Sequence, residues 1–277
     1  NNIVTTGGSL AMKVTNDLTA HAAVLSHGGA TLDAQNVKLS ADLMSDKNLT
    51  ITAKNNIFTK EGANLSTKSD GRLKAHTADL GGDVRADGTL TIETDDKLTA
   101  KNITAGSAAA LNAGTALTAQ NITAGGGLNA KAKNITVTSV TGKGNADLTA
   151  EQNATLGGKT DVGGNLTAQV GNDLIAVGAV ITGKELIANV GNDLAVNDLV
   201  STGGNASLTV GRNVTLDGAL ITGGDFTAKV GNDFTANGAL TTGGNFTANV
   251  AHDLTANDAV TTGADFAAIV GNNAFRL

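Results

Sequence analysis

Apolar and polar residues alternate over short stretches throughout the chain. In FTAKV, residues 226–230, phenylalanine, alanine and valine alternate with threonine and lysine. Successive side chains of a strand point to opposite faces, so this spacing of two predicts short β-strands. No segment carries apolar residues at the spacing of an amphipathic helix. Turns are expected at Gly-Asn-Asp, Asn-Gly and Gly-Gly, because these residues tolerate positive φ or bond their own backbone.

From Gly163 onward the same pattern returns with a constant period of 20. The segment ITGGDFTAKVGNDFTANGAL, residues 221–240, is followed by TTGGNFTANVAHDLTANDAV. Two sets of recurring residues illustrate the period: Gly163, Gly183, Gly203, Gly223, Gly243 and Gly263, and Val170, Val190, Val210, Val230, Val250 and Val270. Three short strands and three turns per copy close one coil. Stacked coils place each strand about 4.8 Å from its own copy in the next coil.

The expected fold is therefore all-β, a single right-handed parallel β-helix, or solenoid, with triangular coils of about 20 residues. We expect one continuous shaft fragment over residues 1–277, with irregular repeats in 1–162 and regular ones in 163–277. In the irregular part, KNITAG at residues 101–106 returns as QNITAG nineteen residues later. Between Lys60 and Asp96 the charge density rises and the repeat blurs, which predicts longer turns or a small bulge.

The amino-acid composition limits which side chains can fill the core and which partners are expected. The 277 residues include 36 Gly and six Phe but no Cys, Pro, Trp or Tyr, so small aliphatic side chains must fill a thin core. The net charge is −6 and the 19 Lys and Arg are scattered. Without a basic stripe, nucleic acid is not an expected partner. No apolar run approaches the roughly 18–20 residues of a membrane helix.

The repeat resembles that of a known family. GGNFTANV (243–250) and GNDFTANGAL (231–240) are similar to the repeats of filamentous haemagglutinin-like exoproteins of Gram-negative bacteria. These are the large partners in two-partner secretion, and they include adhesins and contact-dependent growth inhibition proteins. The resemblance implies a β-helix shaft, passage through an outer-membrane transporter, and display at the bacterial cell surface. The family's N-terminal secretion domain and C-terminal toxin domain are not found, so a middle section of shaft is expected.

Few residues suggest chemistry. GGKT at residues 157–160 resembles the end of a phosphate loop, but position 153, where that motif needs its first Gly, is Asn. His252 stands at a repeating turn position and is expected to be exposed. His21 and His27 are close enough in sequence to approach each other, which leaves a metal role as an alternative for them. We assign no catalytic, cofactor-binding or metal-ligating residue and expect no cofactor.

Two recurring sets of polar residues have alternative interpretations. Asp173, Asp193, Asp233 and Asp253 recur at one turn and form either a weak cation ladder or, as we favour, acceptors for turn amides. The favoured role is one that Asn213 and Asn273 can share. A set of threonines also recurs: Thr182, Thr202, Thr222, Thr242 and Thr262. Outward threonine arrays bind ice, but the alternation from Leu240 places Thr242 inward or at a corner, so a strand-filling role is favoured.

Ten Asn-x-Ser/Thr triplets also occur, and modification at them is an alternative to simple turn and strand positions. The triplets begin at Asn48, Asn64, Asn102, Asn121, Asn134, Asn153, Asn165, Asn205, Asn213 and Asn245.

The predicted function is that of a non-enzymatic structural and adhesive shaft of a large secreted bacterial surface exoprotein. Expected partners are host or bacterial cell-surface receptors or glycans, the outer-membrane transporter, and other copies by end-to-end association. One alternative is the stalk of a contact-dependent toxin-delivery protein. Alternatives of another class are an ice-binding solenoid and a polysaccharide-acting β-helix enzyme, although the latter usually needs sugar-stacking aromatics.

Overall fold

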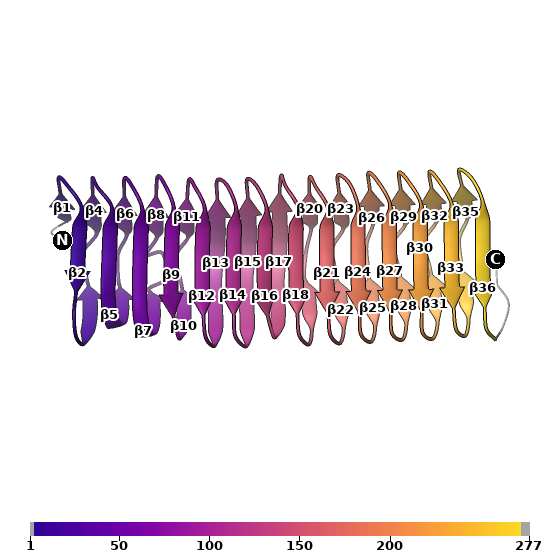
Figure 1. The fold of residues 1–277 in the computed structure, drawn as a ribbon, viewed down its shortest axis with the longest axis horizontal. Coiled ribbons are helices and arrows are strands. Elements are labelled where there is room, and N and C mark those ends of the chain that lie inside the picture. The colour runs from indigo at the N-terminus through magenta and orange to yellow at the C-terminus, as the bar shows by residue number, and fades with distance from the viewer. Residues whose placement is uncertain (1–2, 273–277) are drawn as a thin grey trace. The chain divides into compact units, whose positions relative to one another are not determined.

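The computed structural model describes residues 3–272 and confirms the predicted fold class. These residues form an all-β parallel solenoid with coils about 20 residues apart. Figure 1 shows the strands and the turns that join them. The described residues contain no helix, and therefore none long and apolar enough to cross a membrane. The chain divides into two compact units, unit 1 (residues 1–133) and unit 2 (residues 134–277). One continuous shaft over 1–277 stays a prediction.

The strands of unit 1 are β1 (Val4–Thr6), β2 (Leu10–Lys13), β3 (Asp17–Ala20), β4 (Val24–Ser26), β5 (Ala30–Leu39), β6 (Leu43–Ser45), β7 (Leu49–Thr59), β8 (Leu65–Thr67), β9 (Gly71–Ala75), β10 (Thr77–Leu80), β11 (Val84–Ala86), β12 (Leu90–Thr94), β13 (Lys97–Ala105), β14 (Ala109–Ala113), β15 (Ala116–Ala124) and β16 (Leu128–Ala132).

The strands of unit 2 are β17 (Asn134–Gly142), β18 (Ala146–Ala150), β19 (Ala154–Leu156), β20 (Thr160–Val162), β21 (Leu166–Val170), β22 (Leu174–Ala176), β23 (Val180–Thr182), β24 (Leu186–Val190), β25 (Leu194–Val196), β26 (Val200–Thr202), β27 (Ala206–Val210), β28 (Val214–Leu216), β29 (Leu220–Thr222), β30 (Phe226–Val230), β31 (Phe234–Ala236), β32 (Leu240–Thr242), β33 (Phe246–Val250), β34 (Leu254–Ala256), β35 (Val260–Thr262) and β36 (Phe266–Val270).

From Val140 onward unit 2 repeats with a constant register. One coil consists of a five-residue strand and two three-residue strands, as in β30, β31 and β32. Each strand pairs in parallel with its own copy, so Phe226 lies beside Phe246 and Leu220 beside Leu240. The same register already holds where Val140 pairs with Thr160. The regular repeat therefore begins in the structure about one coil before Gly163.

Unit 1 has coils of unequal length. Leu43 pairs with Leu65, and Leu65 pairs with Val84, so the first of these two coils is longer than the second. The longer coil contains a tight turn in which the N–H of Ala63 donates to the carbonyl of Lys60 at 2.9 Å. The extra residues that this turn adds to the coil confirm the longer turn expected between Lys60 and Asp96. A register shift also occurs between β5 and β7 at Ala34 and Asn36, outside that stretch.

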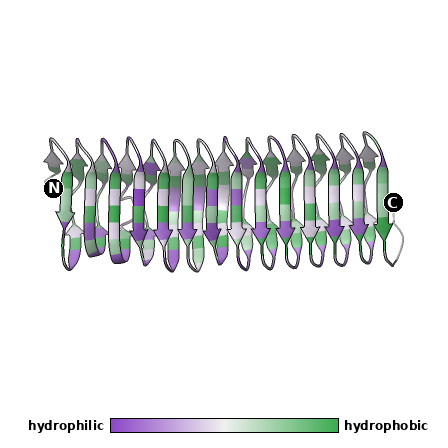
Figure 2. Ribbon diagram, in the orientation of Figure 1, coloured by the Kyte–Doolittle hydropathy of each residue, from purple (hydrophilic) through white to green (hydrophobic). Residues whose placement is uncertain are grey.

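The interior consists of columns, which we define as residues at the same place in successive coils. In unit 2 the inward residues of the five-residue strands from β18 to β33 are buried, and Val230 is 3% exposed. The rings of Phe226 and Phe246 lie 5.2 Å apart, and those of Phe246 and Phe266 stack at 4.8 Å. The phenylalanines at this place in successive coils thus form one column. Figure 2 shows the alternation as green and pale bands along the long strands, with purple at many turns.

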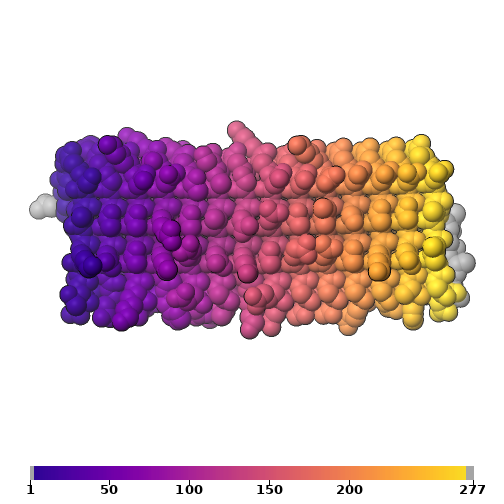
Figure 3. Space-filling view, viewed as in Figure 1, coloured from indigo at the N-terminus to yellow at the C-terminus, as the bar shows by residue number. Residues whose placement is uncertain are grey.

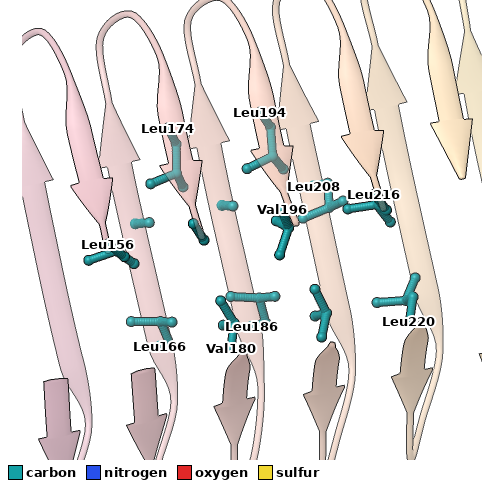
Figure 4. Close-up of a pocket in the computed structure, with 14 residues that line it drawn as sticks. Leu156, Leu166, Leu174, Val180, Leu186, Leu194, Val196, Leu208, Leu216 and Leu220 are labelled. Carbon is teal, nitrogen blue, oxygen red and sulfur yellow. The ribbon is translucent and has the colours of Figure 1, made fainter. Parts of the chain in front are cut away.

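The aliphatic part of the unit 2 core contains a small void of about 30 Å³. Figure 4 shows leucine and valine side chains from several coils directed into it, including Leu166, Leu186 and Val196. Ala168 and Ala188 line the same space. Aliphatic side chains alone leave this gap, whereas phenylalanine occupies the interior from Phe226 onward. At about 24 cal/mol per Å³, the void costs roughly 0.7 kcal/mol.

Many turn glycines have a reason that the sequence did not indicate. Tolerance of positive φ is one of the two reasons to expect these residues at turns, but among residues 3–272 only Gly62 has a positive φ, of 77°. Instead, the backbones of successive coils approach closely. A Cβ added at Gly203 would lie 2.2 Å from the carbonyl oxygen of Gly183, and one at Gly223 would lie 2.4 Å from that of Gly203. Steric room between coils, not backbone conformation, therefore selects glycine in this column.

Candidate functional site

Polar side chains at the turns of unit 2 form ladders that join successive coils. In the first ladder, the side-chain oxygen of each residue accepts the backbone N–H of the residue at the same place in the next coil. The N–H of Asp193 donates to Oδ1 of Asp173 at 3.2 Å, and that of Asn213 to Oδ1 of Asp193 at 3.1 Å. The described members are Asn134, Asn153, Asp173, Asp193, Asn213, Asp233 and Asp253. This geometry confirms the interpretation of the aspartates as amide acceptors, while Asn273 lies outside the described residues.

Asp193 is the most engaged carboxylate of this ladder. Partial burial raises the pKa of Asp193, but hydrogen bonds from Arg212 and from the backbone and side chain of Asn213, with the Arg212 charge, outweigh it. The net result is a pKa below the usual range, so Asp193 is ionised at neutral pH. The Arg212 side chain crosses from the next coil to reach it. Both oxygens of the Asp193 carboxylate therefore accept hydrogen bonds from residues of the next coil.

A second ladder follows the turns before most five-residue strands of unit 2. The N–H of Asp225 donates to Oδ1 of Asn205 at 2.8 Å, and that of Asn245 to Oδ1 of Asp225 at 2.7 Å. The preceding coils use Asn145 and Asn165 in the same way. Asparagine and aspartate alternate freely here, because both present an oxygen at the same distance from the backbone. The ladder therefore selects side-chain length and an acceptor rather than charge.

The threonine column of unit 2 faces the interior, as predicted from Leu240. Thr182, Thr202, Thr222 and Thr242 are each 3% exposed or less. Each hydroxyl donates to the carbonyl two residues later, as in Thr222 to Gly224 at 2.9 Å. These hydroxyls are not available as an outward array.

Another buried threonine of unit 2 lies in a different column. Thr160 is paired with Val140 in the coil before it and with Val180 in the coil after it. Its buried Oγ1 has no hydrogen-bond partner among the described residues. A hydroxyl thus stands where the neighbouring coils place valine methyl groups.

Unit 1 carries a column of alternating charge that the sequence did not reveal. His27, Asp46, Lys68 and Asp87 each follow a residue of one paired column, from Ser26 to Ala86. His27 Nδ1 lies 2.9 Å from one oxygen of Asp46, and Lys68 Nζ lies 2.8 Å from the other. The hydrogen bonds from Lys68 and then His27 lower the pKa of Asp46, and the bond to Asp46 raises the pKa of Lys68. The unequal lengths of these coils hide this column from a search at fixed period.

The remaining residues considered from the sequence lie at turns. The GGKT segment joins β19 to β20, where Lys159 contacts Asp161 at 2.6 Å. His27 contacts Asp46, as above, whereas His21 and His252 are exposed, the latter as predicted. Within residues 3–272 no group of three His, Cys, Asp or Glu side chains could hold a metal ion.

The asparagines of the Asn-x-Ser/Thr triplets belong to the ladders. Most of their side-chain oxygens accept backbone amides, as Asn64 does from Asp83 at 2.8 Å. Some also donate to the preceding coil, as Asn121 does to Asn102 at 2.7 Å. Turn asparagines also bond directly from coil to coil, as Nδ2 of Asn257 donates to Oδ1 of Asn237 at 2.7 Å.

Comparisons with family models, curated proteins and solved structures find no match to this chain. The parallel β-solenoid is therefore established by its own geometry, and its resemblance to filamentous haemagglutinin-like repeats rests on the repeat residues.

Proposed function

We propose that the chain is a section of the structural and adhesive shaft of a secreted bacterial surface exoprotein of the filamentous haemagglutinin type. Its role is mechanical: it holds binding regions away from the cell and contributes weak, repeated contacts. The observation that supports this most directly is the column structure. Identical or matched residues bond from coil to coil within each unit, as in the ladder through Asp173, Asp193 and Asn213.

The same observation favours a non-enzymatic role. The turn carboxylates accept backbone amides, and the recurring threonines are buried and bonded to their own turns. In the proposed setting the parent protein passes through an outer-membrane transporter and acts outside the cell. Its partners are receptors or glycans on host cells or neighbouring bacteria.

Outward side chains form the surface available for such contacts. Along the five-residue strands of unit 2, the outward residues form rows that are mostly polar, such as Thr167, Ile187, Ser207, Thr227 and Thr247. The orange and yellow part of Figure 3 shows side chains aligned in rows across successive coils. Regular rows of this kind offer the same contact many times, which increases overall attachment when each contact is weak.

Binding of the labelled chain to intact host cells and to neighbouring bacteria tests the adhesive part. The control is a variant in which the outward residues of β21, β24, β27, β30 and β33 are permuted while the inward columns are kept. Saturable binding that the control loses supports adhesion by this section. Equal binding by both forms contradicts it. Thermal hysteresis, or release of reducing ends from acidic polysaccharides, would replace the proposal by ice binding or catalysis.

A further inference from the structure

Unit 1 has a polar surface depression of about 430 Å³ at the start of β9. Its lining comes from three successive coils and consists of Asn48, Leu49, Thr50, Asp70, Gly71, Arg72, Thr89 and Thr91. The volume lies within the range of about 300–1,000 Å³ that is usual for small-molecule sites. The depression falls partly within the irregular stretch between Lys60 and Asp96.

Coil-to-coil bonding fixes the walls of this depression. The N–H of Thr89 donates to Oδ1 of Asp70 at 2.8 Å, and the N–H of Asp70 donates to Oδ1 of Asn48 at 3.4 Å. Arg72, the next outward residue after Asp70, pairs with Thr50 in the preceding coil and with Thr91 in the following coil. The depression is therefore held by strands and a ladder, and binding requires little ordering of its walls.

The same bonds leave a defined set of polar groups free. Within the described residues, Oδ2 of Asp70, Nδ2 of Asn48 and the hydroxyls of the three lining threonines have no hydrogen-bond partner. Asn48 and Asp70 are exposed, whereas the threonines are half-buried. Arg72 contacts Glu93 through Nη2 at 3.0 Å, which leaves its other N–H groups available. The Asp70 carboxylate, the Asn48 amide and three threonine hydroxyls therefore line the same depression.

We infer that this depression binds a neutral sugar ring through adjacent hydroxyl groups. Oδ2 of Asp70 accepts from one or two ring hydroxyls, and Nδ2 of Asn48 and the Arg72 guanidinium donate to their oxygens. Asp70 and Glu93 together outweigh the charge of Arg72, which disfavours an anionic ligand. One lining carboxylate is too few for a divalent cation, which prefers six or more oxygen ligands.

This inference rests on the proposed adhesive function, since it names the ligand class of one contact. The sugar is part of either a host glycoconjugate or a bacterial surface polysaccharide, and the chemistry of recognition is shared. Binding is tested on free sugars in solution, so its failure removes the site without deciding whether the chain attaches to cells.

The experiment records backbone amide shifts of the full chain during titration with neutral methyl glycosides of galactose, glucose, mannose and N-acetylglucosamine. We expect saturable shifts at residues 48–50, 70–72 and 89–91 with at least one glycoside. Inorganic phosphate is titrated in parallel as the anionic probe. Competition by glycans released from host glycoproteins or by bacterial polysaccharide then identifies the source of the sugar.

A matched pair of variants locates the contact. Asp70→Asn keeps the Oδ1 acceptor of the ladder but replaces the free carboxylate oxygen by a donor, so affinity should fall at least about tenfold. Asp83→Asn makes the same change at another ladder position, where Oδ1 accepts from Asn102 at 2.6 Å, and should bind like the original chain. Equal losses in both variants, shifts with phosphate alone, or no saturable shift with any glycoside would overturn the inference.

Discussion

Unit 1 and unit 2 build the same kind of coil and both use ladder bonds, but they differ in register, and most charged contacts between coils lie in unit 1. In unit 2 the register is constant from Val140 onward, and amide and carboxylate oxygens accept backbone N–H groups in long ladders. In unit 1 the register changes between the pairing of Leu43 with Leu65 and that of Leu65 with Val84, and opposite charges meet across coils, as in Lys68 with Asp46 and Arg72 with Glu93. A constant coil length favours identical neighbours, whereas a variable one accommodates complementary neighbours.

Ladder bonds and exposed ion pairs differ in how much stability is lost when one residue is changed. A ladder oxygen satisfies a backbone amide, and an unmade bond of this kind costs about 1–3 kcal/mol when buried. An exposed ion pair contributes only about 0–1 kcal/mol and weakens with salt. We therefore expect unit 2 to depend on its columns, and unit 1 to tolerate changes in its surface pairs.

The largest effect is expected from placing a charge in a column of unit 2. Val230→Asp introduces a carboxylate at a position that is 3% exposed, which should cost several kcal/mol and open the neighbouring coils. Hydrogen exchange should show lost protection in β27, β30 and β33. The control Lys229→Asp changes the adjacent outward residue and should leave protection unchanged. A Val230→Asp chain with unaltered thermal stability would show that the column assignment is wrong.

A smaller effect should follow from crowding the backbone between coils. Gly203→Ala brings a methyl group toward the carbonyl of Gly183, with an initial separation of 2.2 Å, and should cost about 1–3 kcal/mol. At the next residue, a Cβ on Gly204 would lie 3.2 Å from its nearest atom, and Lys184 occupies the same column. Gly204→Ala should therefore cost less. Denaturant unfolding of both variants measures the difference, and equal costs would contradict the steric explanation.

Two buried threonines of unit 2 should respond in opposite directions to loss of the hydroxyl. Thr160→Val removes an Oγ1 without a partner among the described residues and should stabilise unit 2 by up to about 1 kcal/mol. Thr222→Val removes the bond to the carbonyl of Gly224 and should destabilise it by about 1 kcal/mol. Unfolding midpoints of the two variants provide the measurement. A change of the same sign in both would mean that burial, not hydrogen bonding, controls the stability at these positions.

The smallest effect is expected at the charged column of unit 1. The pKa of Asp46 is below its usual 3.8, so ionised Asp46 stabilises the folded state above that pH. This contribution is lost as pH falls through the lower folded-state pKa. The difference in thermal midpoint between the original chain and Asp46→Asn should therefore shrink as pH falls below about 4. A difference that grows on acidification would contradict the pairing with Lys68 and His27.

Sequence reasoning predicted the features that repeat and missed those that do not. The alternation around Phe226 and the column through Val230 were sufficient to predict the coils, because burial follows directly from a short period of two within a long period of 20. The contact of Asp46 with Lys68 could not be predicted, because it spans a coil lengthened by the turn at Lys60–Ala63. The depression beside Asp70 and Arg72 was equally hidden, since it depends on which outward side chains of three unequal coils become neighbours.

The constant register of unit 2 also makes whole coils interchangeable in evolution. If residues 205–224 were excised, Gly204 would precede Asp225, and Leu186 and Val190 would meet Phe226 and Val230 in place of Ala206 and Val210. In these columns an apolar residue would again pack on an apolar residue. The two coils brought together would therefore need no new type of contact. Recombination between the coding repeats can thus lengthen or shorten this part of the protein in steps of one whole coil, without selection having to repair the fold.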